Sequence, residues 1–264
     1  MSQRTDIRPP LVLFADDGAP AADVAWSWLI SHRWDGWTQR TITVQSTLYP
    51  GGPPLRLSRH VHRQPPAEAG FVTWDHVDRE GDPRTVLLGQ SDASLILVGS
   101  HHHGHLAGML AGSTAEWLLV HPPAPLLLAP HGHLTRSAVL CVDGSSHSRR
   151  ALDVFVSLPW SVDVSVSLVS VEDGVTDTEQ ALARSAAAFA GRTPPELVSL
   201  TGEPKKEITA FARTHEVDLV VLGTRGLSGL RRMSAGSTVS ALVKDDTANL
   251  LIAHVDEADE SAWE

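Results

Sequence analysis

The amino-acid sequence predicts an α/β protein built from two tandem open parallel five-stranded sheets, each with helices on both faces. Three observations lead to this fold class. The 264-residue chain repeats one series of landmarks in its two halves, and such a repeat decides the architecture. Short apolar runs alternate with helical segments, a pattern typical of parallel strands joined by helical crossovers. The runs lack polar alternation, as expected of strands covered on both faces.

Four pairs of short motifs define the repeat. Members of a pair lie 121 to 126 residues apart, so both order and spacing are kept. In chain order, the pairs are Asp17-Gly18 with Asp143-Gly144, Gly81-Asp82-Pro83 with Gly202-Glu203-Pro204, Leu95–Gly99 with Leu219–Gly223, and Gly112-Ser113-Thr114 with Gly236-Ser237-Thr238. We therefore expect two units of one kind, the first copy at residues 1–134 and the second copy at residues 135–264.

Five apolar, β-branched runs predict the strands of the second copy. They lie near residues 138–143, 163–171, 196–201, 218–223 and 249–254. Between them, the alanine-rich segment 179–190 predicts a helix. Pro204 stands where the first turn of a helix accepts proline, because that position needs no N–H donor.

The first copy follows the same plan with one departure in its second crossover. Five prolines fall within residues 49–66, so we expect a loop or a shortened helix there. Trp26 and Trp28 are predicted to be core positions of a helix. The joining segment, residues 130–136, is short, so the copies should pack together.

Bulk composition excludes several classes of function. The formal net charge of −10 disfavours loose binding to nucleic acid or to an anionic membrane. With only three lysines, an anion site must rely on arginine, backbone N–H groups or a helix N-terminus. No apolar stretch approaches the ~20 residues of a transmembrane helix. The first ten residues lack the apolar core of a secretory signal, and Cys141 is the only cysteine, so we expect a cytoplasmic protein without disulfides.

Glycine–serine motifs of the second copy fall where open parallel sheets bind ligands, beyond the carboxyl ends of the strands. Asp143-Gly144-Ser145 ends the first strand, and Gly223-Thr224-Arg225-Gly226 ends the fourth. Nine residues then separate Gly226 from Gly236-Ser237-Thr238, which opens a helix. Singly, such motifs are ordinary turns and N-caps. Together they give a glycine-lined loop that leads into a helix N-terminus, which favours a di- or triphosphate.

These motifs resemble the ATP-binding branch of the universal stress protein family, in its tandem two-domain form. The repeat extends the resemblance over nearly the whole chain. Because single-domain members of the family pair through their last strands, the resemblance implies that residues 126–129 and 250–254 pair within this chain, and homodimerisation stays open. The resemblance has further implications. It implies a Rossmann-like fold, of the adenine nucleotide alpha hydrolase type, and ATP as the ligand, with or without Mg²⁺. It also places Asp143 and Val171 at the adenine and ribose end and Leu222 beneath the base. The carboxylate of Asp143 suits this role because it accepts hydrogen bonds, although an aspartate before glycine also forms turns.

The remaining residues that the resemblance assigns lie along the ribose and phosphates. They are Gly223, Gly226, Gly236, Ser237 and Thr238, with Gly144 and Ser145 from the first motif and Arg225 as a charge partner. No catalytic residue and no resident metal site are assigned.

The first copy departs from this pattern. Ala19 replaces the serine after Asp17-Gly18, and His102 stands at the second motif glycine. A Cβ where the backbone needs a positive φ costs on the order of 1 kcal/mol. Binding in the first copy therefore depends on whether His102 donates to phosphate instead. The corresponding residues of this less certain site are Asp17, Gly99, His102, Gly112, Ser113 and Thr114.

The histidines at positions 101, 102, 103 and 105 also raise a metal hypothesis. Consecutive side chains rarely aim at one point, and no cysteine or nearby carboxylate completes a ligand set. We therefore predict a solvated or phosphate-facing loop here.

Three classes of function are compatible with the sequence. The first is a nucleotide-binding stress or regulatory protein whose shape or partners respond to ATP. The second is an enzyme with at most slow ATP hydrolysis, because the chain lacks a Gly-x4-Gly-Lys-Ser/Thr loop and the phosphate loop contains no lysine. The third is a ligand-free structural tandem that acts through protein partners. The complete motif of the second copy favours the first class.

Overall fold

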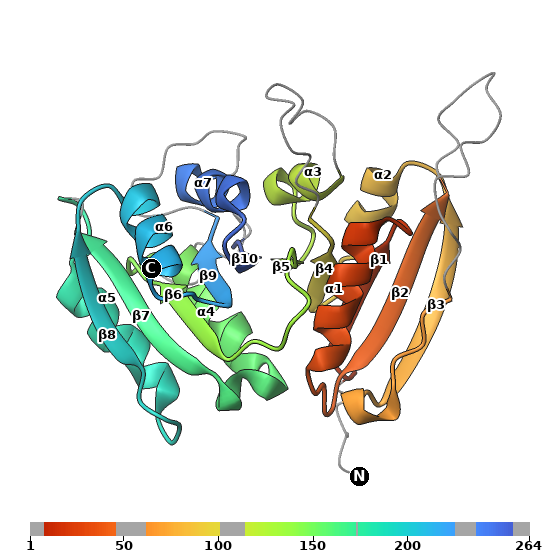
Figure 1. Ribbon diagram of the computed structural model, residues 1–264, viewed down its shortest axis with the longest axis horizontal. Coiled ribbons are helices and arrows are strands. Elements are labelled where there is room, and N and C mark those ends of the chain that lie inside the picture. Colours follow the sequence, from red (N-terminus) through yellow and green to blue (C-terminus); the bar gives the residue numbers. More distant parts are fainter. Residues whose placement is uncertain (1–7, 46–61, 101–113, 173, 225–235, 256–264) are drawn as a thin grey trace, which may run out of the picture.

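The computed structural model describes residues 8–45, 62–100, 114–172, 174–224 and 236–255. Within these residues, ten strands form one continuous sheet in the order β3-β2-β1-β4-β5-β10-β9-β6-β7-β8. Figure 1 shows the first copy at one side and the second copy at the other, with β5 and β10 between them. The predicted α/β class with two similar units is confirmed.

The first copy contributes half of this sheet. Its strands are β1 (Leu11–Asp16), β2 (Thr38–Gln45), β3 (Thr73–Glu80), β4 (Leu95–Val98) and β5 (Leu126–Leu128). Its helices are α1 (Pro20–Ser31), α2 (Pro83–Leu88) and α3 (Thr114–Val120), with the 3-10 turn η1 (Ala67–Ala69). The proline-rich crossover lies partly outside the described residues. Its described end, residues 62–66, is not helical, as the prolines predict.

The second copy supplies the other half, with strands close to those predicted. They are β6 (Ser137–Cys141), β7 (Ser165–Glu172), β8 (Glu196–Thr201), β9 (Leu219–Gly223) and β10 (Asn249–Ala253). The helices are α4 (Ser146–Ser157), α5 (Thr178–Ala186), α6 (Pro204–Thr214) and α7 (Ser237–Asp245), with the 3-10 turns η2 (Pro159–Asp163) and η3 (Ala187–Phe189). Pro204 is the first residue of α6, as predicted.

The two half-sheets are joined through their last strands. Within each half all strand pairs are parallel, whereas β5 and β10 are antiparallel, with Leu128 opposite Leu250 and Leu126 opposite Ile252. The predicted pairing within the chain is thus confirmed. The two expected five-stranded sheets are consequently one ten-stranded sheet, because each short apolar edge is covered by the other.

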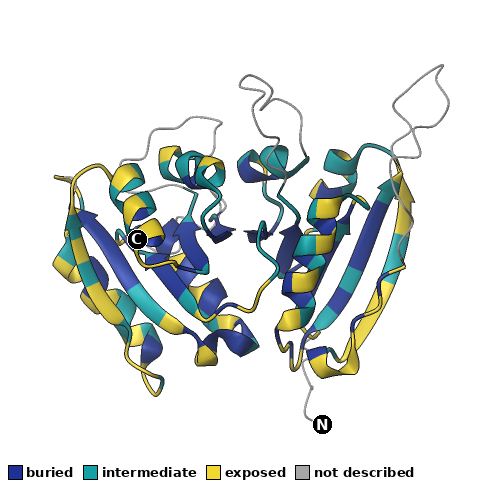
Figure 2. Ribbon diagram, in the orientation of Figure 1, coloured by how far each residue is buried: buried dark blue, intermediate teal, exposed yellow. Residues whose placement is uncertain are grey.

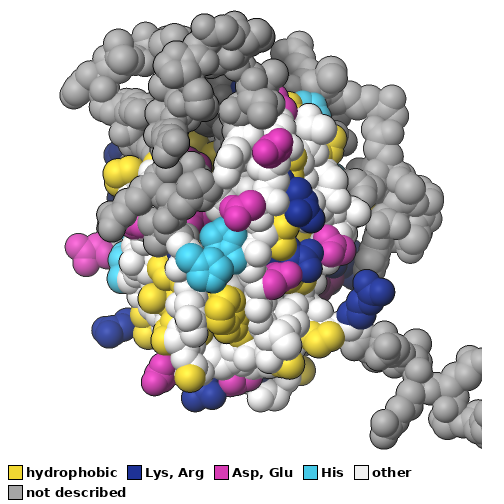
Figure 3. Space-filling view, turned by 90° about the vertical axis from the view of Figure 1, so that its right-hand side faces the viewer, with side chains coloured by type: hydrophobic (Ala, Val, Ile, Leu, Met, Phe, Trp, Pro, Cys, Tyr) yellow, Lys and Arg dark blue, Asp and Glu magenta, His cyan; other side chains and the backbone are white. Residues whose placement is uncertain are grey.

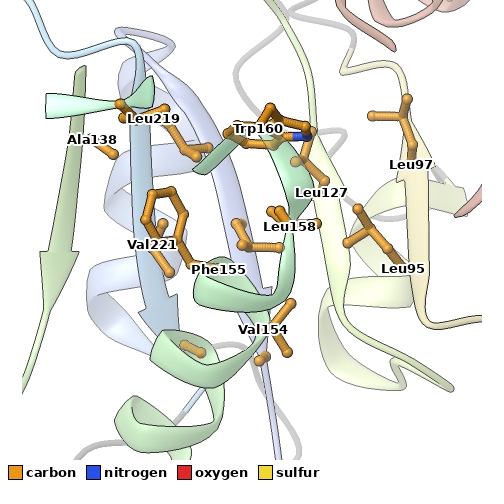
Figure 4. Close-up of a cluster of buried hydrophobic side chains, with 14 of the residues drawn as sticks. Leu95, Leu97, Leu127, Ala138, Val154, Phe155, Leu158, Trp160, Leu219 and Val221 are labelled. Atoms are coloured by element: carbon orange, nitrogen blue, oxygen red, sulfur yellow. The ribbon is translucent and has the colours of Figure 1, made fainter. Parts of the chain in front are cut away.

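Apolar side chains are buried on both faces of this sheet. In Figure 2, buried residues follow the strands near the centre of the sheet. One layer lies under α1 and α4 and is continuous across the two copies. Figure 4 shows part of it, with Leu95 and Leu127 of the first copy near Phe155 and Leu158 of the second. The other layer contains residues from α2, α3, α6 and α7. The copies therefore share a core.

An aromatic cluster forms the centre of the contact between the copies. Trp34 and the corresponding Trp160 of the second copy meet edge to face, with ring centroids 6.2 Å apart. Trp28 lies 5.6 Å from Trp160 and donates from Nε1 to Oγ1 of Thr135 at 3.1 Å. Trp28 is fully buried, as predicted, whereas Trp26 is only partly buried. Rings of this size bury enough area to hold two units together.

The joining segment is held against the second copy by one carboxylate. Asp218 accepts hydrogen bonds from the backbone N–H groups of Arg136 and Ser137, at 2.8 and 2.9 Å, and contacts His133 at 3.0 Å. Burial alone would raise the pKa of Asp218, but these hydrogen bonds outweigh it and lower the pKa. None of the described helices has the length and apolar character needed to cross a membrane.

Candidate functional site

The predicted ligand residues of the second copy meet at the carboxyl edge of the sheet. In the parallel ladders, Cys141 lies opposite Val169 of β7, and Leu140 lies opposite Val221 of β9. Continuing both ladders by two or three residues places Asp143 between Val171 and Thr224. Residues far apart in the sequence are thereby brought side by side, at the place where parallel sheets bind ligands.

Asp143 shapes the turn that links β6 to α4. Its Oδ1 accepts hydrogen bonds from the N–H of Ser145 at 3.0 Å and from the hydroxyl of Ser145 at 2.6 Å. Gly144 has a φ of +81°, which glycine adopts without strain. Ser145 is the N-cap of α4, because its Oγ accepts from the N–H of Ser148 at 3.1 Å. Asp143 thus forms the turn that one reading of the sequence expected, and Ser145 contributes a structural cap.

Two glycines allow close approach of backbone segments at this edge. A Cβ added to Gly223 would lie 2.6 Å from the carbonyl carbon of His147, so the end of β9 packs directly on the first turn of α4. A Cβ added to Gly236 would lie 2.8 Å from the carbonyl oxygen of Thr224. The N-terminus of α7 is therefore pressed against the chain that leaves β9, and neither position tolerates a larger residue without movement.

The N-terminus of α7 has the features of an anion site. Its N-cap is Gly236, which has no side chain to accept a hydrogen bond. The first backbone hydrogen bond of the helix runs from the N–H of Ser240 to the carbonyl oxygen of Gly236. The N–H groups of Ser237, Thr238 and Val239 consequently have no partner within the helix. Ser237 is exposed and Thr238 is half-buried. Free N–H groups and the positive end of the helix dipole both favour a negative ligand.

The floor of the site is apolar. Val171 and Leu222 are buried in the layer that contains the α6 and α7 side chains. Burial raises the pKa of the neighbouring Cys141 to about 12, and Asp143 adds to the effect, so this thiol stays protonated. An apolar surface beside a carboxylate and a helix N-terminus suits a flat base joined to a charged group.

Some predicted residues lie outside the described residues. These are Arg225 and Gly226 of the second copy and His102, Gly112 and Ser113 of the first. The histidine-rich segment 101–105 lies there as well. Among the residues that the structure does describe, no group of three or more potential ligands is arranged to hold a metal ion.

The first copy repeats the turn but changes what surrounds it. Asp17 Oδ1 accepts from the N–H of Ala19 at 3.0 Å, as Asp143 does from Ser145. A Cβ on Gly99 would lie 2.6 Å from the backbone of Ala21, as for Gly223 and His147. Thr114 opens α3, a helix of seven residues. Ala19 caps α1 without a side-chain hydrogen bond.

The sequence did not predict two sets of contacts near the carboxyl ends of the strands, one in each copy. The guanidinium of Arg63 pairs with Asp16 at 2.6 Å and with Asp23 at 2.7 Å, and it lies over the ring of Phe14. In the second copy, Nδ1 of His147 accepts from the N–H of Val255 at 3.1 Å, which ties α4 to the chain beyond β10. Neither has a sequence signal, because Arg63 lies in a proline-rich crossover and His147 in a helix without a motif of its own.

Comparison with known proteins identifies the family. The family model described as "Universal stress protein family" matches residues 12–130 and 163–254 of this sequence. Because these segments make up most of the chain, the protein belongs to the universal stress protein family, and it carries the family's unit twice.

Individual relatives agree with this assignment. Universal stress protein Rv2623 of Mycobacterium tuberculosis is 31% identical over 187 residues, which are 61% of this chain and 62% of the relative. The chain therefore matches less than two thirds of that protein's length. Universal stress protein Slr1230 of Synechocystis sp. is 24% identical over 215 residues, covering 79% of this chain and 69% of the relative.

Solved structures show the same fold. The crystal structure of a universal stress protein from Archaeoglobus fulgidus covers 92% of this chain and 98% of its own, with a TM-score of 0.73 and 18% identity. Two shorter universal stress protein structures, one in complex with cAMP and one from Arabidopsis thaliana with AMP bound, match 46% and 47% of this chain at a TM-score of 0.38. Those ligands are properties of those two proteins.

Proposed function

We propose that this protein binds ATP at the carboxyl edge of the second copy and that nucleotide occupancy changes the shape or the partners of the two-copy unit. One observation carries the proposal. The N-terminus of α7, whose N-cap glycine offers no side-chain acceptor, lies against Thr224 directly after β9, at the carboxyl edge of the sheet that also carries Asp143 and Val171. This arrangement joins donors for phosphate to an apolar floor and a carboxylate for base or ribose.

Each predicted residue has a role in this arrangement. Val171 and Leu222 support the adenine, and Asp143 accepts from ribose or base donors. Gly223 and Gly236 keep the backbone close enough for the N–H groups of Ser237 and Thr238 to reach the phosphates. Gly144 and Ser145 hold the turn, while Gly226 and Arg225 continue the phosphate loop. The site holds ATP with or without Mg²⁺, because its phosphate donors are backbone groups.

In this proposal the two units are residues 1–134 and 135–264, and they differ in nucleotide binding. The first copy has the departures at Ala19 and His102, so we expect one nucleotide per chain. The cytoplasm is the compartment proposed for it, since the only thiol stays protonated and no disulfide is required.

Calorimetric titration with ATP, followed by native mass spectrometry, tests the proposal. One equivalent of ATP per chain is expected, and absence of binding or of a thermal shift would instead favour a ligand-free structural tandem. Incubation with ATP and Mg²⁺ distinguishes a binder from an enzyme. Turnover well above about one per minute would contradict a passive binder, since typical enzymes are far faster.

A further inference from the structure

The outer edge of β3 is open along its whole length among the described residues. Within the described part of the chain, β3 and β8 end the ten-stranded sheet, and no described strand pairs with the outer side of either. β3 has eight residues, all exposed or half-buried. The last strands, β5 and β10, already pair with each other, so any strand addition has to take place at one of the two outer edges. Open edges are templates for a further strand.

The backbone of β3 presents alternate residues to a partner. Gly81, directly after the strand, donates its N–H to Gln45 O of β2 at 3.0 Å. Because successive residues of a strand point their N–H and C=O groups to opposite sides, Trp74, His76 and Asp78 point theirs outward. An antiparallel partner therefore forms hydrogen-bonded pairs with these residues, and the residues between them form the closer, non-hydrogen-bonded pairs.

The charges along β3 are arranged to match a second β3. Asp75 and Arg79 lie on one face of the strand, two residues to either side of Val77, and His76 and Asp78 flank Val77 on the other face. With a two-fold axis at Val77, each Asp75 faces an Arg79 of the other copy. On the other face, the His76 side chain is only 7% exposed and its Nε2 already lies 2.9 Å from Oγ1 of Thr43, so it is left to contacts within the chain. Shifting the register by two residues sets Val77 against Arg79 in one direction and against Asp75 in the other. Only the register centred on Val77 sets Asp75 against Arg79.

Exposure supports this pairing. The side chains of Asp75 and Asp78 are 49% and 63% exposed, so both have room for a further contact although Asp75 already pairs with Arg40 and Asp78 lies 3.7 Å from Nε2 of His76. Val72 and Trp74 are also exposed, at 58% and 39%. Figure 3 looks onto this side of the molecule and shows acidic, basic and histidine side chains interleaved with apolar ones.

A shallow groove of mixed polar and apolar surface lies at the start of the same strand. It has a volume of about 390 Å³, and its lining includes Pro65, Phe71 and Trp74. In the register centred on Val77, the partner's turn at residues 81–83 comes beside this groove. The opposite edge has no such features, since β8 carries Glu196 as its only charged residue.

We propose that two copies of this chain associate through antiparallel pairing of their β3 strands, centred on Val77, to give a sheet of twenty strands. Charges on an edge strand oppose pairing with most other strands. Here the same charges favour one partner, the two-fold-related β3. This interface is independent of nucleotide binding, because the proposed ATP site is in the second copy.

Sedimentation velocity over a concentration series of the full chain tests the charge pairing. Asp75→Arg alone and Arg79→Asp alone each create like-charge pairs, so each should weaken dimerisation by about tenfold or more. An equimolar mixture of the two variants should regain the wild-type association, because the introduced arginine of one chain then faces the introduced aspartate of the other. Glu196→Arg, on the opposite edge, should leave association unchanged. A wild-type chain that stays monomeric, or a mixture that does not recover, would overturn the proposal.

Disulfide trapping tests the register. Val77→Cys places two thiols in a non-hydrogen-bonded pair, where Cα atoms lie about 4.5 Å apart and a disulfide is possible. Rapid cross-linking is expected, and Leu197→Cys on β8 serves as the matched control. The native Cys141 does not interfere, because its pKa is raised to about 12 and its thiol stays protonated. Cross-linking of Leu197→Cys in place of Val77→Cys would assign the interface to β8 and refute the β3 pairing.

Discussion

Asp16 in the first copy and Val142 in the second occupy the same place after a central strand, and both are buried. The valine packs in the layer beneath α4. The aspartate is held by Arg63, which reaches it from residues 62–66, the described and non-helical end of the crossover. In the second copy, the corresponding crossover contains the helix α5, which buries Ala181 and Leu182. Among the described residues, the first copy thus has an ion pair at a position where the second has apolar contacts.

The two copies show which features this fold requires and which features can differ between the copies. Both copies keep a glycine, Gly99 or Gly223, where a Cβ would collide with the backbone of the first helix. Both keep an aspartate that closes the turn into that helix. We expect the ion pair of Asp16 and the apolar contacts of Val142, both at the end of a central strand, to be exchangeable, because either can fill a buried position. Four predictions test this comparison, in order of expected size.

The largest effect is expected at the buried ion pair of the first copy. Arg63→Met leaves the carboxylate of Asp16 buried without its partner and should lower the free energy of unfolding by about 3–5 kcal/mol. Asp16→Val combined with Arg63→Leu, which gives the first copy the valine of the second, should recover most of that loss. Denaturant unfolding of the three proteins measures both values. Equal losses in the single and double variants would show that the ion pair and the apolar contacts are not exchangeable.

A second difference lies at the contact between the copies, where His32 corresponds to Leu158. Burial lowers the pKa of His32 to about 4, against a partly compensating hydrogen bond to Trp28 O and smaller effects of His133 and Asp218. Its Nε2 accepts from the N–H of Thr135 at 3.1 Å, which requires the neutral ring.

Stability should therefore depend on pH through His32. Since the folded pKa is below the unfolded value of 6.5, the contribution is complete above pH 6.5 and is lost as the pH falls towards 4. The expected loss is about 2–3 kcal/mol. Unfolding free energies measured between pH 7 and pH 4 check this, with His32→Leu as the comparison. The variant should be less stable at pH 7 but less sensitive to acid, and parallel curves would contradict the assignment.

The third prediction concerns the unequal nucleotide sites. Gly236→Val puts a Cβ 2.8 Å from Thr224 O and displaces the N-terminus of α7, so ATP affinity should fall by at least about 100-fold, or about 2.7 kcal/mol. Gly112→Val, at the corresponding position of the first copy, should change the affinity by less than about twofold. Calorimetry gives both constants. A larger effect of Gly112→Val would reverse the assignment of the sites.

The smallest effect is expected at the helix caps. Ser145→Ala removes the hydrogen bond to Ser148 N–H and should cost about 1 kcal/mol. Ala19→Ser offers the first copy a cap that it lacks and should stabilise by a comparable or smaller amount. Thermal unfolding of the two variants measures the shifts. If Ser145→Ala left the melting temperature unchanged, the cap would be of no consequence to the fold.

The sequence predicted where the strands of the second copy lie along the chain, for reasons that are local. Strands such as Leu219–Gly223 are short apolar runs, and Pro204 begins a helix because its missing N–H is not needed there. The turn at Asp143 also follows from a few neighbouring residues. Arg63 escaped prediction because its partners are 40 and 47 residues away and no periodicity connects them.

By itself, the sequence determined that this protein is a duplicated α/β unit with one complete glycine–serine motif, because repeats, hydrophobic runs and turn residues act over short distances. Only the tertiary structure decided that the last strands of the two copies pair antiparallel, that Trp34 meets Trp160, and that β3 is left as an open edge. These outcomes depend on which surfaces remain uncovered after each copy has folded. That depends on contacts between residues far apart in the chain, such as Leu126 with Ile252.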